Sequence, residues 1–168
     1  MDSFSSPELL RDHAGISFQE QIRTLSMTEF ESVAAKVDSH AAVGITNDDG
    51  EVLLMNDGSH GWTLIAFPVD PTEDWTAVTR QEAESLLDVT VVLERIETVR
   101  RIDFHPESDN DQRFSIYHVI FNASIEGDVV VAESETTTDE DLTLKWFDSV
   151  PDNQEDEVAD DIERFLEA

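Results

Sequence analysis

The sequence has no cysteine and very few basic residues. The absence of cysteine excludes disulfide bonds, thiolate nucleophiles and zinc sites built from cysteine. Only ten residues are Lys or Arg, and Lys36 and Lys145 are the only lysines. No basic stripe is therefore present to displace counterions from phosphates, so we expect no binding to nucleic acid.

Long apolar runs and several catalytic motifs are also missing. No run approaches the roughly 20 residues of a membrane-spanning helix, and Met1 to Ser6 does not begin a signal peptide. We therefore expect a cytoplasmic protein with no membrane partner. The G-x-S-x-G, P-loop and G-x-G-x-x-G motifs do not occur, so serine-hydrolase and P-loop chemistry lack support. His105 and His118 have no second histidine at metal-binding spacing, which indicates structural roles.

Acidic residues dominate the composition, because 39 Asp and Glu give a net charge of −29. Charge of one sign repels itself and destabilises the compact state at low ionic strength. In molar salt the Debye length falls to about 3 Å, which screens most of this repulsion. The charge is spread over the chain, which favours a solvated surface over a docking site for a basic partner. We interpret this as an adaptation to a high-salt cytoplasm, and the composition resembles that of haloarchaeal proteins.

The chain of 168 residues, with 39% apolar residues, nine Phe and three Trp, can form one folded domain. Its first 38 residues are polar, and their apolar side chains recur near helical spacing. Thr28 followed by Glu31 fits a capping box. We therefore predict a helical lead-in over residues 1–38 and the main domain over residues 39–168.

From His40 onward the pattern changes to short β-rich runs. Asn47-Asp48-Asp49-Gly50 lies between two of these runs and predicts a β-hairpin. Further strands are predicted over residues 61–69, 89–104, 113–125, 128–134 and 142–147.

Two helices are predicted among the strands. The first runs from Pro71–Glu73 to Leu87, with Thr72 as its N-cap. The second follows Pro151. Its apolar face consists of Val158, Ile162, Phe165 and Leu166. Strands on both sides of one central helix, with another helix at the end, give a layered α+β domain.

The stretch from Phe67 to Val89 resembles the signature of the Nudix hydrolase superfamily, G-x5-E-x7-R-E-U-x-E-E-x-G-U, where U is a bulky apolar residue. Laid on this signature without gaps, Glu73 and Glu82 match its first two glutamates. The other positions are held, in signature order, by Phe67, Gln81, Ala83, Ser85, Leu86, Asp88 and Val89.

Flanking runs extend this resemblance over residues 40–168. W-T-L and V-D-P precede the helix, E-D-W follows the turn, and L-K-W-F-D-S-V-P occurs late in the chain. The resemblance implies a Nudix fold, in which a mixed β-sheet is sandwiched between helices in α/β/α layers.

The resemblance also implies metal chemistry. Three carboxylates on the signature helix of an active member hold Mg²⁺ or Mn²⁺, which neutralises charge on a substrate diphosphate and activates the attacking water. The corresponding trio here is Glu82, Ser85 and Leu86, so one carboxylate remains. A register shifted by one residue, which places Glu84 on a signature glutamate, also leaves one of three.

The candidate catalytic residues are Glu82 and Glu84, and the candidate metal ligands are Glu82 and Glu73. Gln81 stands where an arginine normally braces the first glutamate. Each of these carboxylates is also explained as a solvated side chain of a very acidic chain. Some family members place a catalytic base in a late loop, which here contains Glu133, Glu135 and Asp139. Three aromatic residues either stack on a ligand base or belong to the core: Trp62, Tyr117 and Phe121.

Two functional hypotheses follow. In the first, the eroded metal box leaves weak or no hydrolysis, and the protein binds a nucleotide-like ligand or a protein partner. In the second, it is an active hydrolase that uses Mg²⁺ or Mn²⁺ to cleave a nucleoside-diphosphate-linked substrate. A homodimer is left open, since Nudix proteins are often dimers.

The acidic composition generates a direct test. Dialysis from molar KCl to low salt is expected to unfold the protein at least partly, because repulsion among its carboxylates is no longer screened. Far-UV circular dichroism measures this loss of secondary structure. An unchanged spectrum at low salt would contradict the interpretation as a high-salt adaptation.

Overall fold

The computed structural model describes most of the chain. The described residues are 7–11, 15–36, 39–47, 49–56, 62–69, 73–87, 89–107, 113–126, 136–137, 143–151 and 156–166. Its helices are the 3-10 helix η1 (Pro7–Leu10), α1 (Met27–Lys36), α2 (Trp75–Leu87) and α3 (Asp156–Leu166). Its strands are β1 (Ser17–Leu25), β2 (His40–Ile45), β3 (Val52–Asn56), β4 (Trp62–Pro68), β5 (Thr90–Pro106), β6 (Phe114–Glu126), β7 (Thr136–Thr137) and β8 (Thr143–Phe147).

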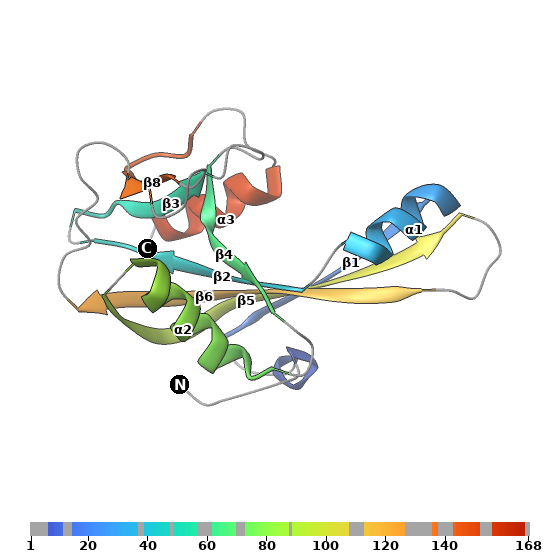
Figure 1. The fold of residues 1–168 in the computed structure, drawn as a ribbon, viewed down its shortest axis with the longest axis horizontal. Helices are drawn as coiled ribbons and strands as arrows, with labels where there is room; N and C mark the ends of the chain where they lie inside the picture. The colour runs from blue at the N-terminus through green and yellow to red at the C-terminus, as the bar shows by residue number, and fades with distance from the viewer. Residues whose placement is uncertain are drawn as a thin grey trace.

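The described strands form one mixed sheet in the order β1-β5-β6-β2-β4-β3-β8-β7. The pairs β1/β5 and β2/β6 are parallel, and the other neighbouring pairs are antiparallel. The long strands β5 and β6 run through the whole molecule, and β1 follows β5 along its outer side (Figure 1).

Helices cover both faces of the sheet, with α2 and η1 on one side and α1 and α3 on the other (Figure 1). Alternate residues of β2 show why. Val43 and Ile45 belong to the core cluster that contains the buried side chains of α2. Ala42 belongs to the cluster that contains Ile162 and Phe165 of α3. The predicted α+β class and the α/β/α layering are therefore confirmed.

A second lobe projects from this body where β1, β5 and β6 extend past the other strands and α1 lies against them (Figure 1). It has its own small core, in which the ring of Phe114 stacks on Phe104 with centroids 4.8 Å apart and lies 5.3 Å from Phe30. The buried members of this core are Phe30, Ile102, Phe104 and Ile116.

The predicted helical lead-in is wrong over its middle part, since residues 17–25 form strand β1. Helix α1 begins only at Met27, and Ser26 caps it by accepting the backbone N–H of Glu29 at 3.2 Å. The predicted capping box at Thr28 therefore lies inside the helix. Apolar residues spaced three apart fit a helix locally, but β1 pairs instead with the distant strand β5. The boundary between lead-in and main domain stays a prediction.

The predicted hairpin is correct as a turn and wrong as a strand pair. Asn47 organises the turn, since its carbonyl accepts the N–H of Gly50 at 3.1 Å and its side-chain oxygen accepts that of Glu51 at 2.9 Å. Gly50 has a φ of 79°, which favours glycine. After a single bridge between Thr46 and Val52 the two strands separate, and β4 pairs between them.

The remaining predicted elements occur largely as expected. The predicted runs over 61–69, 89–104, 113–125 and 142–147 correspond to β4, β5, β6 and β8, and the closing helix to α3. The predicted strand over residues 128–134 lies outside the described residues.

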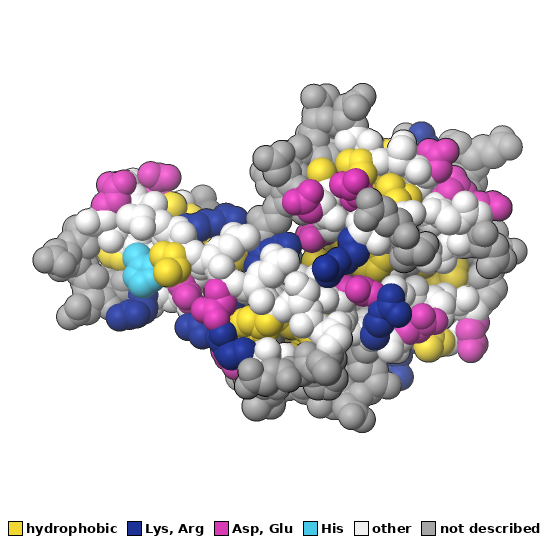
Figure 2. All heavy atoms as spheres, turned by 180° about the vertical axis from the view of Figure 1, so that it is seen from behind, with side chains coloured by type: hydrophobic (Ala, Val, Ile, Leu, Met, Phe, Trp, Pro, Cys, Tyr) yellow, Lys and Arg dark blue, Asp and Glu magenta, His cyan; other side chains and the backbone are white. Residues whose placement is uncertain are grey.

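The face seen in Figure 2 is mixed in charge. Seen from behind, basic side chains lie among acidic ones and form no continuous basic stripe on that face (Figure 2). Within the part of the chain that the structure describes, no helix is long and apolar enough to cross a membrane.

Gly44 of β2 determines how α3 can dock. A Cβ at this position would overlap the ring of Phe165, which is 2% exposed. Gly44→Ala is therefore expected to displace Phe165 and to lower the free energy of unfolding by about 1–3 kcal/mol. Chemical denaturation in molar KCl measures this loss.

The double variant Gly44→Ala with Phe165→Leu is the control, since a smaller side chain on α3 leaves room for the new methyl group. We expect it to lose less than the sum of its two single variants. Equal stability of Gly44→Ala and the wild type would show that α3 does not pack on Gly44.

Candidate functional site

The site begins at the N-terminus of α2, which Asp74 caps. Its Oδ1 accepts the backbone N–H of Thr76 at 3.1 Å and of Ala77 at 3.3 Å. The helix therefore starts at Trp75, and its predicted start at Pro71–Glu73 was too early. The predicted N-cap, Thr72, lies outside the described residues.

One row of side chains anchors α2 to the sheet. Residues four apart lie on one face of a helix, and the buried row here consists of Trp75, Thr79, Ala83 and Leu87. The buried Thr79 hydroxyl donates a hydrogen bond to the carbonyl of Trp75 at 2.6 Å. This row fixes the rotation of α2 and so determines where its other side chains point.

The predicted catalytic pair does not come together. Two positions along an α-helix correspond to roughly 200° of rotation, so Glu82 and Glu84 leave α2 on opposite flanks of the buried row. Glu82 is exposed, Glu84 is half-buried, and Glu73 is exposed ahead of the helix. The catalytic and metal-binding roles of Glu82, Glu84 and Glu73 stay predictions.

The other signature positions do not supply metal ligands. Ser85 is exposed, and Leu86 is half-buried and packs against the main core. Phe67, at the first glycine position, is paired with Ala41 inside β4. Asp88 and the late-loop carboxylates Glu133, Glu135 and Asp139 lie outside the described residues.

The described residues do not fit a divalent metal ion of the expected kind. Mg²⁺ and Mn²⁺ prefer several oxygen ligands, usually including more than one carboxylate. Among the residues the structure describes, no group of three or more His, Asp or Glu side chains could hold an ion. The flank of α2 around Glu82 offers one carboxylate beside the apolar Leu86.

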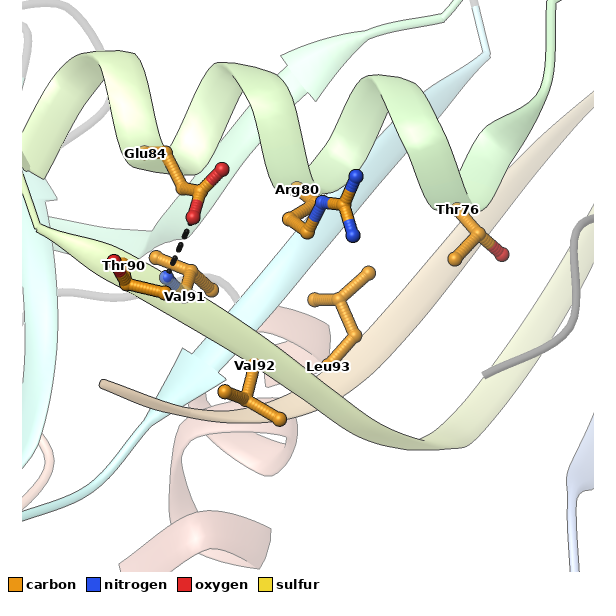
Figure 3. Close-up of a pocket in the computed structure, with 7 residues that line it drawn as sticks. All are labelled: Thr76, Arg80, Glu84, Thr90, Val91, Val92 and Leu93. Atoms are coloured by element: carbon orange, nitrogen blue, oxygen red, sulfur yellow. Dashed lines mark hydrogen bonds between the residues drawn. The ribbon is translucent and has the colours of Figure 1, made fainter. Parts of the chain in front are cut away.

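Glu84 has a structural contact instead. Its carboxylate accepts the backbone N–H of Val91 at 3.0 Å, at the beginning of β5 (Figure 3). This hydrogen bond ties the C-terminal half of α2 to the central strand pair.

A pocket lies on this flank, between α2 and the start of β5. Its volume is about 290 Å³. The residues that line it are Thr76, Arg80 and Glu84 from α2 and Thr90, Val91, Val92 and Leu93 from β5. The guanidinium of Arg80 extends along α2 toward Thr76, away from Glu84, and Leu93 points up from the strand beneath it (Figure 3).

Arg80 gives the pocket a positive charge. Its side chain is exposed, and no described residue forms a hydrogen bond or ion pair with it. The buried side chains of Val91 and Leu93 form the apolar floor, and Thr76 and Thr90 add hydroxyl groups. Glu84 adds a negative charge, but the Arg80 guanidinium points away from it, so the Arg80 end of the pocket can hold an anionic group beside an apolar one (Figure 3).

The aromatic residues singled out in the sequence do not share a pocket. Phe121 is fully buried in the core beneath α2. Trp62 packs edge-on against Phe147, with centroids 4.8 Å apart, on the α3 side of the sheet. Trp62 and Phe121 therefore lie on opposite faces of the sheet.

Sequence reasoning missed two groupings that only the tertiary structure creates. His40 lies beside His118 across β2 and β6, with ring centroids 5.7 Å apart. Tyr117 donates its hydroxyl to the carboxylate of Glu8 at 2.8 Å, and Arg101 also binds that carboxylate. No local motif in the sequence signals either grouping, because their members are far apart in the chain.

Comparison with known proteins identifies the fold. No family model matches the chain, and no curated protein matches it. The crystal structure of a NUDIX hydrolase from Nitrosomonas europaea is similar, with a TM-score of 0.50 and 17% identity over 78% of this chain and 72% of that one. At this identity the likeness shows the fold alone. The chain has the Nudix fold, as its sequence predicted.

Two further structures are less similar. The match to a UDP-X diphosphatase has a TM-score of 0.48 and 16% identity, and covers 84% of this chain and 70% of that one. The match to a C. elegans Ap4A hydrolase has a TM-score of 0.43 and 17% identity, and covers 78% of this chain and 96% of that one.

The two glutamates of α2 differ in their contacts, which gives a matched pair of variants. Glu84→Ala removes the acceptor of the Val91 N–H and is expected to lower the free energy of unfolding by about 1 kcal/mol. Glu82→Ala removes the same charge from an exposed position and is expected to change stability by less than about 0.5 kcal/mol. Urea denaturation of both variants in molar KCl makes the comparison, and equal losses would contradict the structural role of Glu84.

Proposed function

We propose that this protein is a Nudix-fold binding module without metal-dependent hydrolysis, and that it binds a nucleotide-like ligand in the pocket between α2 and β5. The observation that carries the proposal is the arrangement of carboxylates on α2. Glu82 stands alone on one flank, and Glu84 on the opposite flank is bound to the backbone of β5.

Hydrolysis of a diphosphate by the family mechanism depends on a cluster of carboxylates that holds the metal next to the substrate. On α2 the position one turn after Glu82 is Leu86, which packs against the core. Replacing this leucine with a carboxylate would place a charge against apolar side chains. Leu86 therefore contributes to core packing at a position where the metal chemistry needs a carboxylate ligand.

The pocket supports the choice of ligand. A phosphate group can pair with Arg80, whose guanidinium suits phosphate oxygens, while a base or another flat apolar group contacts Val91 and Leu93. At molar salt the Debye length is about 3 Å, so long-range attraction is weak and recognition depends on direct contacts. A pocket that combines one arginine with an apolar floor offers such direct contacts in a high-salt cytoplasm.

The proposal is tested with a panel of nucleoside-diphosphate derivatives in molar KCl with Mg²⁺ or Mn²⁺. We expect at least one compound to raise the melting temperature, with no phosphate release above that of a blank without protein. Arg80→Gln is expected to lower the apparent affinity for this compound about tenfold or more, since it removes the charge-assisted hydrogen bonds to phosphate. The melting temperature should then rise less at the same ligand concentration.

Arg113→Gln is the matched control, because it makes the same change at an exposed arginine that does not line the pocket. It should bind like the wild type. Phosphate release that disappears in Glu82→Gln would overturn the proposal and establish the active hydrolase. Binding that survives Arg80→Gln unchanged would show that the ligand lies elsewhere.

A further inference from the structure

A cluster of hydrogen-bond donors surrounds the carboxylate of Glu8 in η1. Its Oε1 accepts hydrogen bonds from the hydroxyl of Tyr117 at 2.8 Å, from Arg11 at 3.0 Å and from Arg101. Its Oε2 accepts a second hydrogen bond from Arg11 at 3.0 Å. In a chain with ten basic residues, two arginines thus converge on one carboxylate.

Two of these donors lie side by side on the sheet. Arg101 and Tyr117 are direct partners across β5 and β6. Arg101 also donates from Nε to Asp103 at 2.9 Å, and the Ser115 hydroxyl donates to the same carboxylate. Asp103 therefore holds Arg101 through Nε, and the terminal nitrogen Nη1 is directed at Glu8.

Glu8 itself is held by a much smaller element. It lies in a helix of four residues, and its side chain keeps 31% of its surface exposed. The partner Arg11 lies three residues away and also binds Glu20 on β1. The sheet thus provides a fixed pair of donors, and a short surface helix provides the acceptor.

We propose that Arg101 and Tyr117 form an oxyanion-binding site that Glu8 fills from within the same chain, and that a phosphate or carboxylate group of an external ligand competes with Glu8 for it. Arginine binds both kinds of oxyanion through two parallel hydrogen bonds, and the tyrosine hydroxyl adds a third donor. This site is separate from the pocket of the proposed function and does not depend on it, because neither donor lines that pocket.

The ionisation of the groups agrees with this geometry. Burial opposes the charge on Glu8, but the hydrogen bonds from Tyr117, Arg101 and Arg11 outweigh it and lower the pKa of Glu8. Burial, followed by the hydrogen bond to Glu8, raises the pKa of Tyr117 to about 12. The folded state therefore favours the neutral phenol, and this contribution to stability is lost as the pH rises from 10 toward 12.

Occupation by Glu8 should suppress binding of free anions. A tethered group acts at an effective concentration in the millimolar range or above, so it outcompetes a weak free anion. Removing the charge of Glu8 should therefore strengthen anion binding by about tenfold or more.

The experiment uses Tyr117, the only tyrosine of the chain, as a reporter. Inorganic phosphate and succinate are titrated separately into wild type and Glu8→Gln in molar KCl, and the ultraviolet difference spectrum of the phenol is recorded. We expect Glu8→Gln to bind at least one of the two anions about tenfold more tightly than wild type. The anion that binds more tightly identifies the ligand class as phosphate or carboxylate.

Three controls make the result specific. Glu20→Gln removes the other carboxylate that Arg11 binds and should leave anion binding at the wild-type level. Adding Arg101→Gln to Glu8→Gln should abolish the gain. Arg80→Gln should leave the gain intact, which separates this site from the α2 pocket.

Equal affinities of wild type and Glu8→Gln for both anions would overturn the proposal, as would a gain that survives Arg101→Gln. If Glu8→Gln does not fold, Glu8→Asp replaces it, because it keeps the charge on a side chain one methylene shorter. Glu8→Asp should then bind phosphate or succinate more tightly than wild type, and equal binding would equally overturn the proposal.

Discussion

The antiparallel pairing of β5 with β6 is the interaction on which the rest of the structure depends. It runs from Thr90 opposite Glu126 to Phe104 opposite Phe114, and both layers of helices pack on it. Two bulges interrupt the register, one between Leu93 and Arg95 and one between Ile96 and Thr98. Each bulge shifts the alternation of side chains by one residue, which changes the face to which the following residues point.

Together, the two bulges change the face of Ile96 and leave the faces of the neighbouring Arg100 and Arg101 unchanged. Arg100 points to the α3 side, where it forms a nearly buried ion pair with Asp161 at 3.1 Å. Arg101 points to the opposite side and meets Glu8. Without the bulges, strict alternation would place Arg101 on the same face as Leu93 and Ile96 on the other face. With both bulges, Leu93, Ile96 and Arg101 all face the α2 and η1 layer.

The packing of α2 also explains how the fold can exist apart from metal chemistry. The helix is held by its row of buried residues at Trp75, Thr79, Ala83 and Leu87, none of which is a carboxylate. The positions that carry ligands in the Nudix signature lie off this row. Substitutions there can remove a metal site without weakening the contact between helix and sheet, so a fold does not establish an activity.

Local signals in the sequence predicted a large part of the fold. The β-rich runs gave β5, β6 and β8, the apolar spacing gave α3, and the Asn-Asp-Asp-Gly turn occurs where it was expected. The errors arose where a distant partner decides the outcome. The strand partner of β2 and the extended form of β1 depend on pairing with remote segments. The contacts of Glu84 with Val91 and of Glu8 with Tyr117 likewise depend on tertiary structure, and spacing alone could not predict them.

The parallel alignment of β1 with β5 has a consequence for the order of folding. Gln19 and Arg100 are opposite each other in this pair although 81 residues separate them. Contacts between such distant segments close a long loop and form slowly. Strand β1 is synthesised before β5 but can pair only after β5 exists, so this edge of the sheet is completed late, once the β5/β6 pair has provided its template.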